Sequence, residues 1–333
     1  MNNSAVVILN WNGQKLLEQF LPSIIQHSGN AQIYVADNAS TDTSISFIQS
    51  QFPQVQIIQN RSNFGFAQGY NEALKQVHEP IFVLVNSDIE VTENWLTPIE
   101  KLLHEQSNVA IVQPKILDFK DKTKFEYAGA AGGFIDRLGY PYCRGRIFDC
   151  IEEDLGQYND TQSIFWASGA CFGIRKNVFT QLQGFDTDFF AHQEEIDLCW
   201  RAINLGHEIV YCSESTVYHV GGATLQASNP QKTYLNFRNS LCMLTKNLPL
   251  LSLLPILFIR LVMDGLAGIQ FLLQGKAAHC WAIVRAHFGF YSLFAKMWKK
   301  RSAHQELNYY KINSIVFRYF VRKQRKFNDL FLT

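Results

Sequence analysis

The feature that most constrains the fold is an alternation of two apolar patterns over the first hundred residues. Short unbroken apolar runs, typical of strands buried on both faces, alternate with segments whose apolar residues recur at helical spacing. The runs cover 5–9, 33–36, 55–58 and 81–85, and the helical segments cover 16–25, 41 onward, 67–77 and 93–104. Pro22 should kink or shorten the first helix. This alternation predicts an α/β fold with a parallel sheet covered on both faces.

Polar or turn-forming residues follow each of the four predicted strands. Any one of these stretches would be ordinary, because Asn, Asp, Ser and Gly are common in loops. In parallel α/β sheets, however, ligands bind beyond the carboxyl ends of the strands. The four strand ends therefore predict one polar crevice, which is lined by Asn10–Gly13, Asp37–Ser40, Asn60–Gly65 and Asn86–Asp88.

The composition excludes a disordered chain and favours an intracellular one. The 333 residues are 47% hydrophobic and 18% charged, enough for one large domain or two. The seven cysteines are odd in number and scattered without a CxxC pair, which is typical of a reducing compartment. The first residues, MNNSAVVILNWNG, lack the basic segment and long apolar run of a signal peptide. We therefore expect a cytoplasmic protein.

The C-terminal part of the sequence suggests contact with a membrane. Residues 248–273 are long and apolar enough to span a bilayer, but two prolines, Arg260 and Asp264 favour an interfacial or re-entrant helix. Arg260 and Asp264 lie four residues apart and could pair. From Lys296 onward there are ten Lys or Arg and two acids, which suits an anionic membrane surface. A helix packed on the body of the protein is the open alternative for 248–273.

Seven stretches together resemble family 2 glycosyltransferases, in which they occur in the same order. They are VVILNWNG, VADNASTD, NFGFAQGYNEAL, LVNSDIEV, SGACFGIRK, GFDTDFFAHQEEIDLCWRA and YHVGG. The closest similarity is to the bacterial rhamnosyltransferase-like branch, over roughly residues 4–247. The resemblance implies inverting enzymes with a GT-A fold, a Rossmann-like, mostly parallel sheet flanked by helices.

The resemblance also implies a domain plan. Residues 1–247 would form the glycosyltransferase domain, with a nucleotide-sugar-binding half at 1–114 and an acceptor and catalytic half at 115–247. Residues 248–333 would form a helical, membrane-associating extension.

A divalent cation is implied by the same resemblance. Transfer from a nucleotide sugar expels a diphosphate, and Mg²⁺ or Mn²⁺ held by one or two protein ligands would neutralise its charge. The predicted ligands are Asp88 and His219. The family pattern is Asp-x-Asp, but this chain has Asn86 at the first position, so Asn86 could contact ribose or water instead. Alternatively, Asn86 and Asp88 only cap the following turn.

The donor would contact the strand ends and the segment after the third strand. Asp37 would accept a hydrogen bond from the pyrimidine ring, which does not distinguish UDP from dTDP, or would only stabilise its own turn. Gly69 costs about 1 kcal/mol within a helix, so we expect a close approach there. The full predicted donor set is Leu9, Asn10, Trp11, Asn12, Asp37, Asn38, Arg61, Gly65, Gly69, Asn71, Asn86, Ser87 and Arg238. For Arg61 and Arg238, ordinary surface positions are the alternative.

The stretch HQEEIDLCWRA supplies the candidate general base. The resemblance places the base at Glu195, with Glu194 as the second choice, and it would take the proton of the acceptor hydroxyl. Asp197 is the third candidate, although pairing with Arg201 at i+4 suits it better. Acids that merely favour a helix N-terminus are the simpler interpretation. The predicted acceptor side is Trp166, Ser168, Gly169 and Ala170, where Trp166 could equally belong to the core.

These inferences predict a metal-dependent inverting glycosyltransferase that acts on a glycan or lipid-linked glycan in bacterial surface polysaccharide synthesis. The donor would be a UDP- or dTDP-sugar, with dTDP-rhamnose suggested by the branch. The enzyme would lie at the inner face of the cell membrane, without a nucleic-acid partner, and a homodimer is left open. The alternatives are a nucleotidyltransferase, although its Gly-rich basic loop is missing after the first strand, and a catalytically silent sugar-nucleotide-binding protein.

Overall fold

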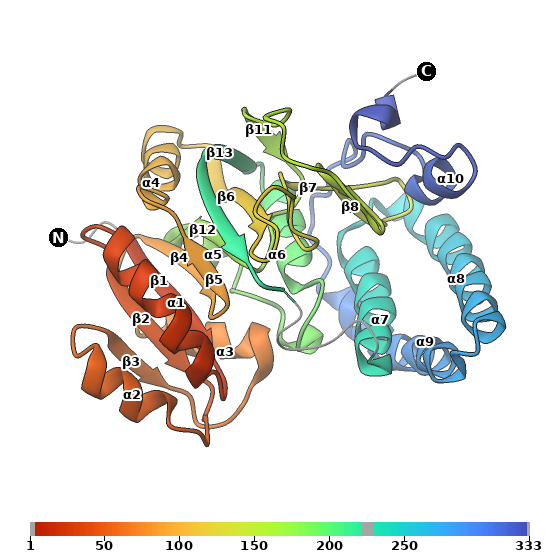
Figure 1. The fold of residues 1–333 in the computed structure, drawn as a ribbon. Helices are drawn as coiled ribbons and strands as arrows, with labels where there is room; N and C mark the ends of the chain where they lie inside the picture. The colour runs from red at the N-terminus through yellow and green to blue at the C-terminus, as the bar shows by residue number, and fades with distance from the viewer. Residues whose placement is uncertain (1–3, 222–228, 332–333) are drawn as a thin grey trace.

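The computed structural model describes residues 4–221 and 229–331. A central sheet runs through the molecule in the strand order β11-β13-β6-β12-β4-β1-β2-β3, and β5 pairs with β13. Figure 1 shows helices on both faces of this sheet and a group of C-terminal helices at its right. This is the α/β architecture that the alternating patterns predict.

The first half of the sheet is parallel, as predicted. Its strands are β1 (Ser4–Asn10), β2 (Gln32–Asp37), β3 (Gln56–Gln59) and β4 (Ile81–Asn86). They pair in parallel, with Asn10 beside Asp37 and Leu9 beside Asn86. The connecting helices are α1 (Gln14–His27), α2 (Ser44–Gln51) and α3 (Gly65–Leu74). Helix α1 continues through Pro22 to His27, so the expected shortening does not occur.

The second half of the sheet is mixed. Strand β12 (Cys171–Arg175) is antiparallel to both β4 and β6 (Val109–Asp118), while β6 is parallel to β13 (Glu208–His219). Strands β5 (Ile89–Val91) and β11 (Thr161–Ile164) pair antiparallel with β13. Helices α4 (Leu96–Glu105), α5 (Lys176–Gln181) and α6 (Glu194–Asn204) and the short η1 (Thr187–Phe189) complete this half. The mixed half brings β5 and the end of β13 together below β4.

The irregular stretch around residues 115–165 folds into a second, small sheet. It contains β7 (Gly133–Ile135), β8 (Pro141–Cys143), β9 (Arg146–Ile147) and β10 (Cys150–Ile151). The remaining helices are α7 (Pro230–Asn247), α8 (Leu250–Leu273), α9 (Ala277–Lys299), α10 (Ile315–Phe320) and η2 (Asn328–Phe331). Helix α7 packs along α9 and also contacts α6. The C-terminal helices therefore reach the middle of the molecule.

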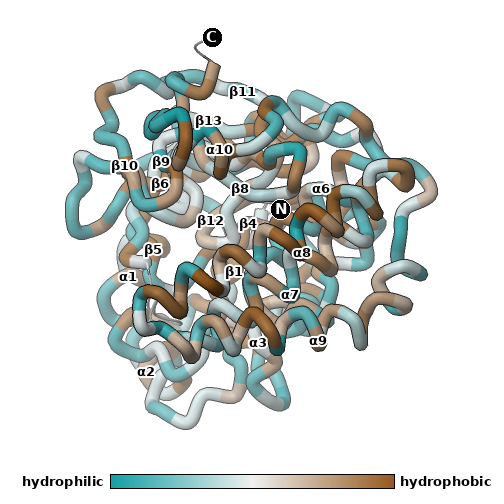
Figure 2. Tube along the Cα trace, turned by 90° about the vertical axis from the view of Figure 1, so that its right-hand side faces the viewer, coloured by the Kyte–Doolittle hydropathy of each residue, from teal (hydrophilic) through white to brown (hydrophobic). Residues whose placement is uncertain are grey.

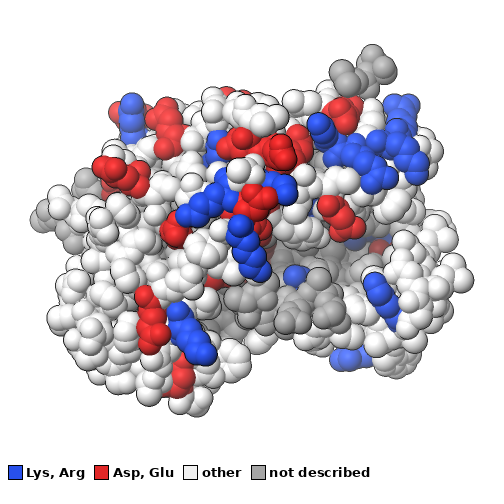
Figure 3. Space-filling view, viewed as in Figure 1, with Lys and Arg blue, Asp and Glu red and all other residues white. Residues whose placement is uncertain are grey.

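The predicted basic tail is not a free arm, because it packs back on the small sheet (Figure 1). The Ile315 N–H donates to Asp136 Oδ2 (2.8 Å), and the Phe327 ring lies against Phe134 and Tyr142. Several of its cations are also engaged within the protein, as described below for Lys296 and Lys300. Figure 3 shows a cluster of Lys and Arg side chains at the upper right, over the segment around α10.

Helix α8 is anchored on one side and exposed on the other. Arg260 and Asp264 are both buried, with their closest charged atoms 3.8 Å apart, which confirms their pairing. The Arg260 guanidinium also donates to Leu138 O (3.1 Å) and stacks 3.9 Å from the Tyr140 ring. Among the described helices, α8 alone is long and apolar enough to cross a membrane. Figure 2 shows it as a largely hydrophobic band on the outer face.

Candidate active site

The ends of β1 and β2 share one buried hydrogen-bond network, as their parallel pairing requires. Asn10 Nδ2 donates to Asp37 Oδ1 (2.9 Å), and Ser40 donates to the same carboxylate through its hydroxyl (2.5 Å) and its backbone N–H (2.8 Å). Asp37 therefore stabilises its own turn. A carboxylate has about four acceptor positions, so one more donor, such as a pyrimidine N–H, can still be accommodated.

The segment after β3 approaches the β2 end closely, which explains two glycines. A Cβ at Gly69 would lie 2.7 Å from Asn38 Nδ2, so the close approach expected at this helical glycine is confirmed. Gly65 has φ +70°, and a Cβ there would lie 2.8 Å from the Phe190 ring. Asn38 Nδ2 donates to Gly65 O (2.9 Å). These contacts join the predicted donor loop to the loop that leads into α6.

Other predicted donor residues differ in how freely they can meet a ligand. Trp11 is 52% exposed just beyond β1, and Arg61 is exposed. Leu9 and Ser87 are half-buried. Asn12 has φ +51° and its Oδ1 accepts from the Thr41 N–H (2.7 Å), so it shapes the turn.

Two members of the predicted donor set are committed to protein contacts. Asn71 donates to Phe185 O (2.7 Å) and accepts from the Phe185 N–H (2.9 Å). These two hydrogen bonds connect α3 to the loop before η1. Arg238 Nη2 donates to Asp188 O (2.9 Å) and Phe189 O (3.2 Å). Asn71 therefore holds the residue just before Asp186, and Arg238 holds η1 itself; sequence spacing indicated neither contact.

Asp88 and His219 meet because β5 pairs with β13. His219 lies opposite Ile89, and its Nε2 is 3.2 Å from Asp88 Oδ1. On the other edge of the ring, His219 Nδ1 is 3.3 Å from Glu126 Oε1. Burial lowers the pKa of His219, but hydrogen bonds to Asp88 and Glu126 outweigh it and raise the pKa to about 10. All three side chains are buried.

The donor set at this point suits a cation that shares its shell with a substrate. In the described part of the chain, no three His, Cys, Asp or Glu side chains are arranged as a metal site. Glu126 lies across the imidazole from Asp88, so only Asp88 and His219 Nε2 can face one ion. One or two protein ligands completed by water and phosphate oxygens are typical of Mg²⁺ and related ions. Asp88 and His219 therefore fit a divalent cation bound together with a diphosphate, and binding of the cation would displace the proton that His219 Nε2 otherwise holds toward Asp88.

Glu194 and Glu195 are the first two residues of helix α6. The segment before them has positive φ angles, which are unusual for residues other than glycine. Glu194 is buried and Glu195 half-buried, and each has one carboxylate oxygen without a hydrogen-bond partner. Burial raises the pKa of Glu195 to about 7. Burial and the charge of Glu195 raise the pKa of Glu194 well above its usual value. A half-buried carboxyl that titrates near neutrality has the properties of a general base.

The predicted acceptor segment packs directly against this base. A Cβ on Gly169 would lie 3.8 Å from the Glu195 side chain. Ala170 O accepts from the Asn86 N–H (2.9 Å), and the Ser168 N–H donates to Gln113 Oε1 (2.8 Å). The segment thus joins the base to the strand end that carries Asn86 and Asp88. Trp166 is buried and donates to Phe134 O (2.9 Å), which is the core position named as its alternative.

Asp197, the third candidate base, is buried in an ion-pair network with Arg201 and Lys246. Arg201 Nε (2.8 Å) and Lys246 Nζ (2.8 Å) bind its Oδ2, and Asn247 Nδ2 (2.9 Å) donates to its Oδ1. Burial alone would raise the pKa of Asp197, but Lys246 and Arg201 lower it. A carboxylate with three partners is better suited to holding α6 in place than to accepting a proton.

Sequence reasoning missed several residues of the site. His192 Nε2 and Gln193 Oε1 are buried atoms without hydrogen-bond partners, directly before Glu194 and Glu195. Four consecutive side chains with such atoms are unusual, because buried polar groups are normally paired. His192 and Gln193 stand in the same stretch as the acids, so their position could have been noticed. Glu126 gave no local signal, because it reaches His219 from the irregular segment.

Comparison with known proteins finds relatives in sequence and in structure. The sequence model of glycosyl transferase family 2 matches residues 5–183, more than half of the chain. The chain is 22% identical over 246 residues to the low-salt glycan biosynthesis hexosyltransferase Agl10 of Haloferax volcanii, covering 72% of this chain and 74% of that protein. It is 22% identical over 231 residues to the N-acetylglucosaminyl-diphospho-decaprenol L-rhamnosyltransferase of Mycobacterium tuberculosis, covering 64% and 75%.

A solved structure shares the fold at low identity. The crystal structure of GalNAc-T7 with UDP, GalNAc and Mn²⁺ superposes with a TM-score of 0.57 and 16% identity, over 74% of this chain. The chain spans about half the length of that structure, 48%, so this likeness concerns the fold alone. The family match carries the stronger conclusion, and the resemblance to the rhamnosyltransferase-like branch agrees with the second relative. The chain belongs to glycosyl transferase family 2.

Proposed function

We propose that this glycosyltransferase is metal-dependent and inverting, and that it transfers a sugar from a UDP- or dTDP-sugar to a hydroxyl of a glycan or lipid-linked glycan. The observation that carries the proposal is the position of Glu195. This half-buried carboxyl has an unpartnered oxygen and packs against Gly169, in the segment that joins it to the Asn86 strand end. In this proposal, a proton acceptor and an ion-binding carboxylate share one site.

In the proposed reaction, Glu195 takes the proton of the acceptor hydroxyl as the oxygen forms a bond to the anomeric carbon. The bond from that carbon to the phosphate oxygen breaks on the opposite side, and the nucleoside diphosphate leaves. Asp88 and His219 would hold a divalent cation, which supplies positive charge to the departing diphosphate when it is bound. Solved neighbours that contain Mn²⁺ support this proposal, although they do not identify the ion for this chain.

The donor nucleotide would lie over the ends of β1 and β2. Asp37 is buried and held by Asn10 and Ser40, so its carboxylate is fixed in one direction before a nucleotide binds. Trp11, 52% exposed, provides a flat aromatic face at the same edge. This arrangement suits a pyrimidine base but treats uracil and thymine alike. The rhamnose of the proposed dTDP-rhamnose donor rests on the relative from Mycobacterium tuberculosis.

The proposal of a lipid-linked acceptor rests on the rhamnosyltransferase relative and on the exposed apolar face of α8. The rhamnosyltransferase relative is named for a lipid-linked acceptor. In this chain, α8 exposes an apolar stripe of leucine, phenylalanine and valine side chains, among them Leu251 (93%), Leu254 (66%) and Phe258 (69%). Exposed basic residues lie near α10, including Arg322, Lys323 and Lys326. We propose that this face lies on an anionic bilayer at the cytoplasmic side, where it would meet a lipid-linked acceptor in the surface polysaccharide pathway.

A donor screen tests the enzymatic part. UDP-N-acetylglucosamine, UDP-glucose, dTDP-rhamnose and GDP-mannose are mixed with the protein in Mn²⁺ or in chelator, and thermal stability is measured. A uridine or thymidine donor should raise the melting temperature only with the metal. Equal stabilisation in chelator would contradict the metal proposal, and stabilisation by GDP-mannose alone would contradict the pyrimidine proposal.

A vesicle experiment tests the membrane part. Replacing Leu254 and Phe258 by Glu should weaken co-sedimentation with vesicles that contain anionic phospholipid, because the apolar stripe would then carry charge. Leu155→Glu is the matched control, since Leu155 is 81% exposed but lies outside α8. Equal sedimentation of both variants would exclude α8 as the docking face.

A further inference from the structure

The loop that leads into the base is strained and cannot hold its shape by itself. Three residues with side chains have left-handed backbone angles, namely Phe190 (φ 61°), His192 (φ 70°) and Gln193 (φ 72°). Such angles are uncommon outside glycine and persist only where surrounding contacts impose them. The loop ends at Glu194 and Glu195, so whatever holds it also sets the position of the base.

Helix α7 holds the carbonyl groups of this loop. Asn239 Nδ2 lies within hydrogen-bonding distance of three carbonyl oxygens of the loop, at 3.0 Å from Phe189 O, 2.9 Å from Ala191 O and 2.7 Å from His192 O. Arg238, the preceding residue, donates to Asp188 O and Phe189 O. Asn239 is buried, so these bonds are shielded from water.

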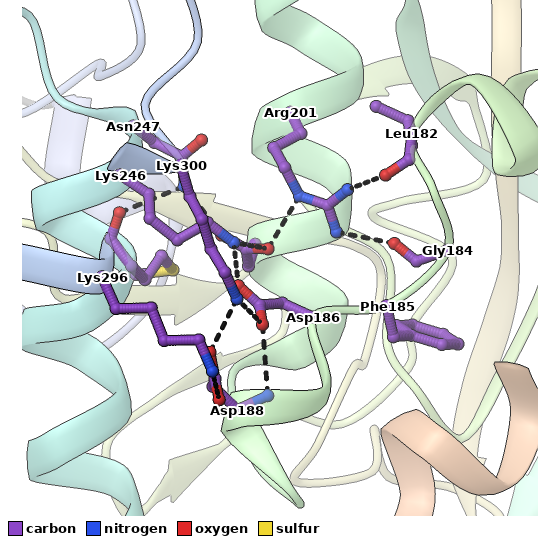
Figure 4. Close-up of polar contacts among 12 residues, drawn as sticks. Leu182, Gly184, Phe185, Asp186, Asp188, Arg201, Lys246, Asn247, Lys296 and Lys300 are labelled. Carbon is purple, nitrogen blue, oxygen red and sulfur yellow. Dashed lines mark hydrogen bonds and ion pairs between the residues drawn. The ribbon is translucent and has the colours of Figure 1, made fainter. Parts of the chain in front are cut away.

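Lysines from α7 and from the end of α9 hold the two acids of the loop. Lys246 Nζ lies 2.7 Å from Asp186 Oδ2, and Lys300 Nζ lies 2.5 Å from Asp186 Oδ1 and 2.7 Å from Asp188 Oδ2. Lys296 Nζ lies 2.6 Å from Asp188 Oδ1. Figure 4 shows the lysine side chains converging on Asp186 and Asp188 from one side, while Arg201 on the other side donates to Leu182 O and Gly184 O just before the loop.

Lys246 also joins this loop to α6 itself. Its Nζ contacts Asp186 Oδ2 of the loop and Asp197 Oδ2 of the helix, with the lysine side chain 3% exposed. One cation therefore fixes the distance between the start of the loop and the first turn of the helix that carries the base. The charges act together, since Lys246 and Lys300 lower the pKa of Asp186 although its burial would raise it.

We propose that Lys246, Lys296 and Lys300 are positioning residues for the reaction, and that the C-terminal helices α7 and α9 clamp the Asp186–Gln193 loop so that Glu195 faces the acceptor. The inference rests on the proposed function, because it takes Glu195 as the base. It gives the C-terminal extension a role in catalysis that is separate from membrane contact.

The contribution of Lys296 and Lys300 distinguishes positioning from stability. Their side chains are 57% and 33% exposed, and exposed ion pairs contribute little to folding. Small displacements of a reacting group can nevertheless lower a rate on the order of a hundredfold. A clamp at the surface should therefore affect turnover much more than it affects the melting temperature.

The test compares Lys296→Gln/Lys300→Gln with the wild type and with Lys299→Gln. Lys299 is exposed on the same helix end and, within the described residues, forms no ion pair. Hydrolysis of UDP-N-acetylglucosamine, UDP-glucose and dTDP-rhamnose is measured with Mn²⁺ across pH 5–9, using the donor that the wild type turns over fastest. The double variant should lose on the order of tenfold or more in kcat, with the donor KM unchanged.

Two further readouts separate the possible explanations. If the loop relaxes and water reaches Glu195, the acid limb of the pH–rate profile should move to lower pH, because less burial lowers its pKa. Lys296→Arg/Lys300→Arg keeps the charges and should restore most of the activity. A double Gln variant with wild-type kcat and pH profile would overturn the inference. A wild-type protein that neither binds nor hydrolyses any of these donors would instead overturn the proposed function on which it rests.

Discussion

Asp88 and Glu195 are the two carboxylates of the proposed site, and their surroundings differ in kind. Asp88 is buried beside an imidazole, with His219 Nε2 3.2 Å from its Oδ1. Glu195 has an oxygen without a partner, and burial raises its pKa to about 7. Removal from water favours the neutral form of a carboxyl, so Glu195 can exchange a proton near neutrality, whereas Asp88 has a ring nitrogen beside it with which it could share a cation. This difference supports the proposal that Asp88 binds the cation and that Glu195 takes the proton.

The largest expected effect is that of removing the base. Glu195→Gln should lower the transfer rate on the order of 10²- to 10⁴-fold, because an amide cannot take the acceptor proton. Donor binding, measured by thermal shift with Mn²⁺, should change little. Glu194→Gln is the matched comparison and should keep more activity. If Glu194→Gln is inactive while Glu195→Gln turns over normally, the two roles are exchanged.

A smaller effect is expected at the metal side of the comparison. Asp88→Asn keeps the size of the side chain but removes its charge, so Mn²⁺-dependent donor binding should weaken on the order of a hundredfold. Glu126→Gln should weaken it on the order of 10- to 100-fold, because Glu126 only orients the His219 ring. Titration of the donor at several Mn²⁺ concentrations measures both effects. Unchanged affinity in Asp88→Asn would leave Asp88 with a turn-capping role.

The smallest effect concerns stability and pH. The raised pKa of Glu195 means that the folded chain binds more protons than the unfolded chain between about pH 4.5 and 7. The wild type should therefore lose stability from Glu195 as the pH rises through this window. Glu195→Gln has no such titration, so its melting temperature relative to the wild type should be higher at pH 8 than at pH 5. A constant difference would show that Glu195 is not perturbed by burial.

The parallel half of the fold could be predicted from the sequence because its signals are local. The run Ile81–Val85 is unbroken and apolar, and it forms β4 with Asn86 at its end. The pairing of Ile89 with His219, by contrast, joins residues 130 positions apart. No periodicity near either residue indicates that pairing, and the resemblance to a family only named Asp88 and His219 as ligands of one ion.

The C-terminal part shows where local reasoning fails. The excess of lysine and arginine after Lys296 indicated a surface for anions, but Lys296 and Lys300 bind acids of the same chain. Arg238 is a second example. Its guanidinium was predicted to bind the donor, but it donates hydrogen bonds to the carbonyl groups of Asp188 and Phe189. The charge of a residue shows which class of group it can bind. Which partner it binds in the folded protein depends on the packing of segments that are distant in the sequence.

The return of the last thirty residues to the small sheet has a consequence for the order of folding during synthesis. The parallel strands β1 to β4 can pair once the first ninety or so residues have left the ribosome. Phe134 and Tyr142, however, stay without their cover until Phe327 emerges almost two hundred residues later. A nascent chain would thus expose an aromatic surface for most of its synthesis. Chaperones could bind this surface, and a prematurely truncated chain would leave it exposed.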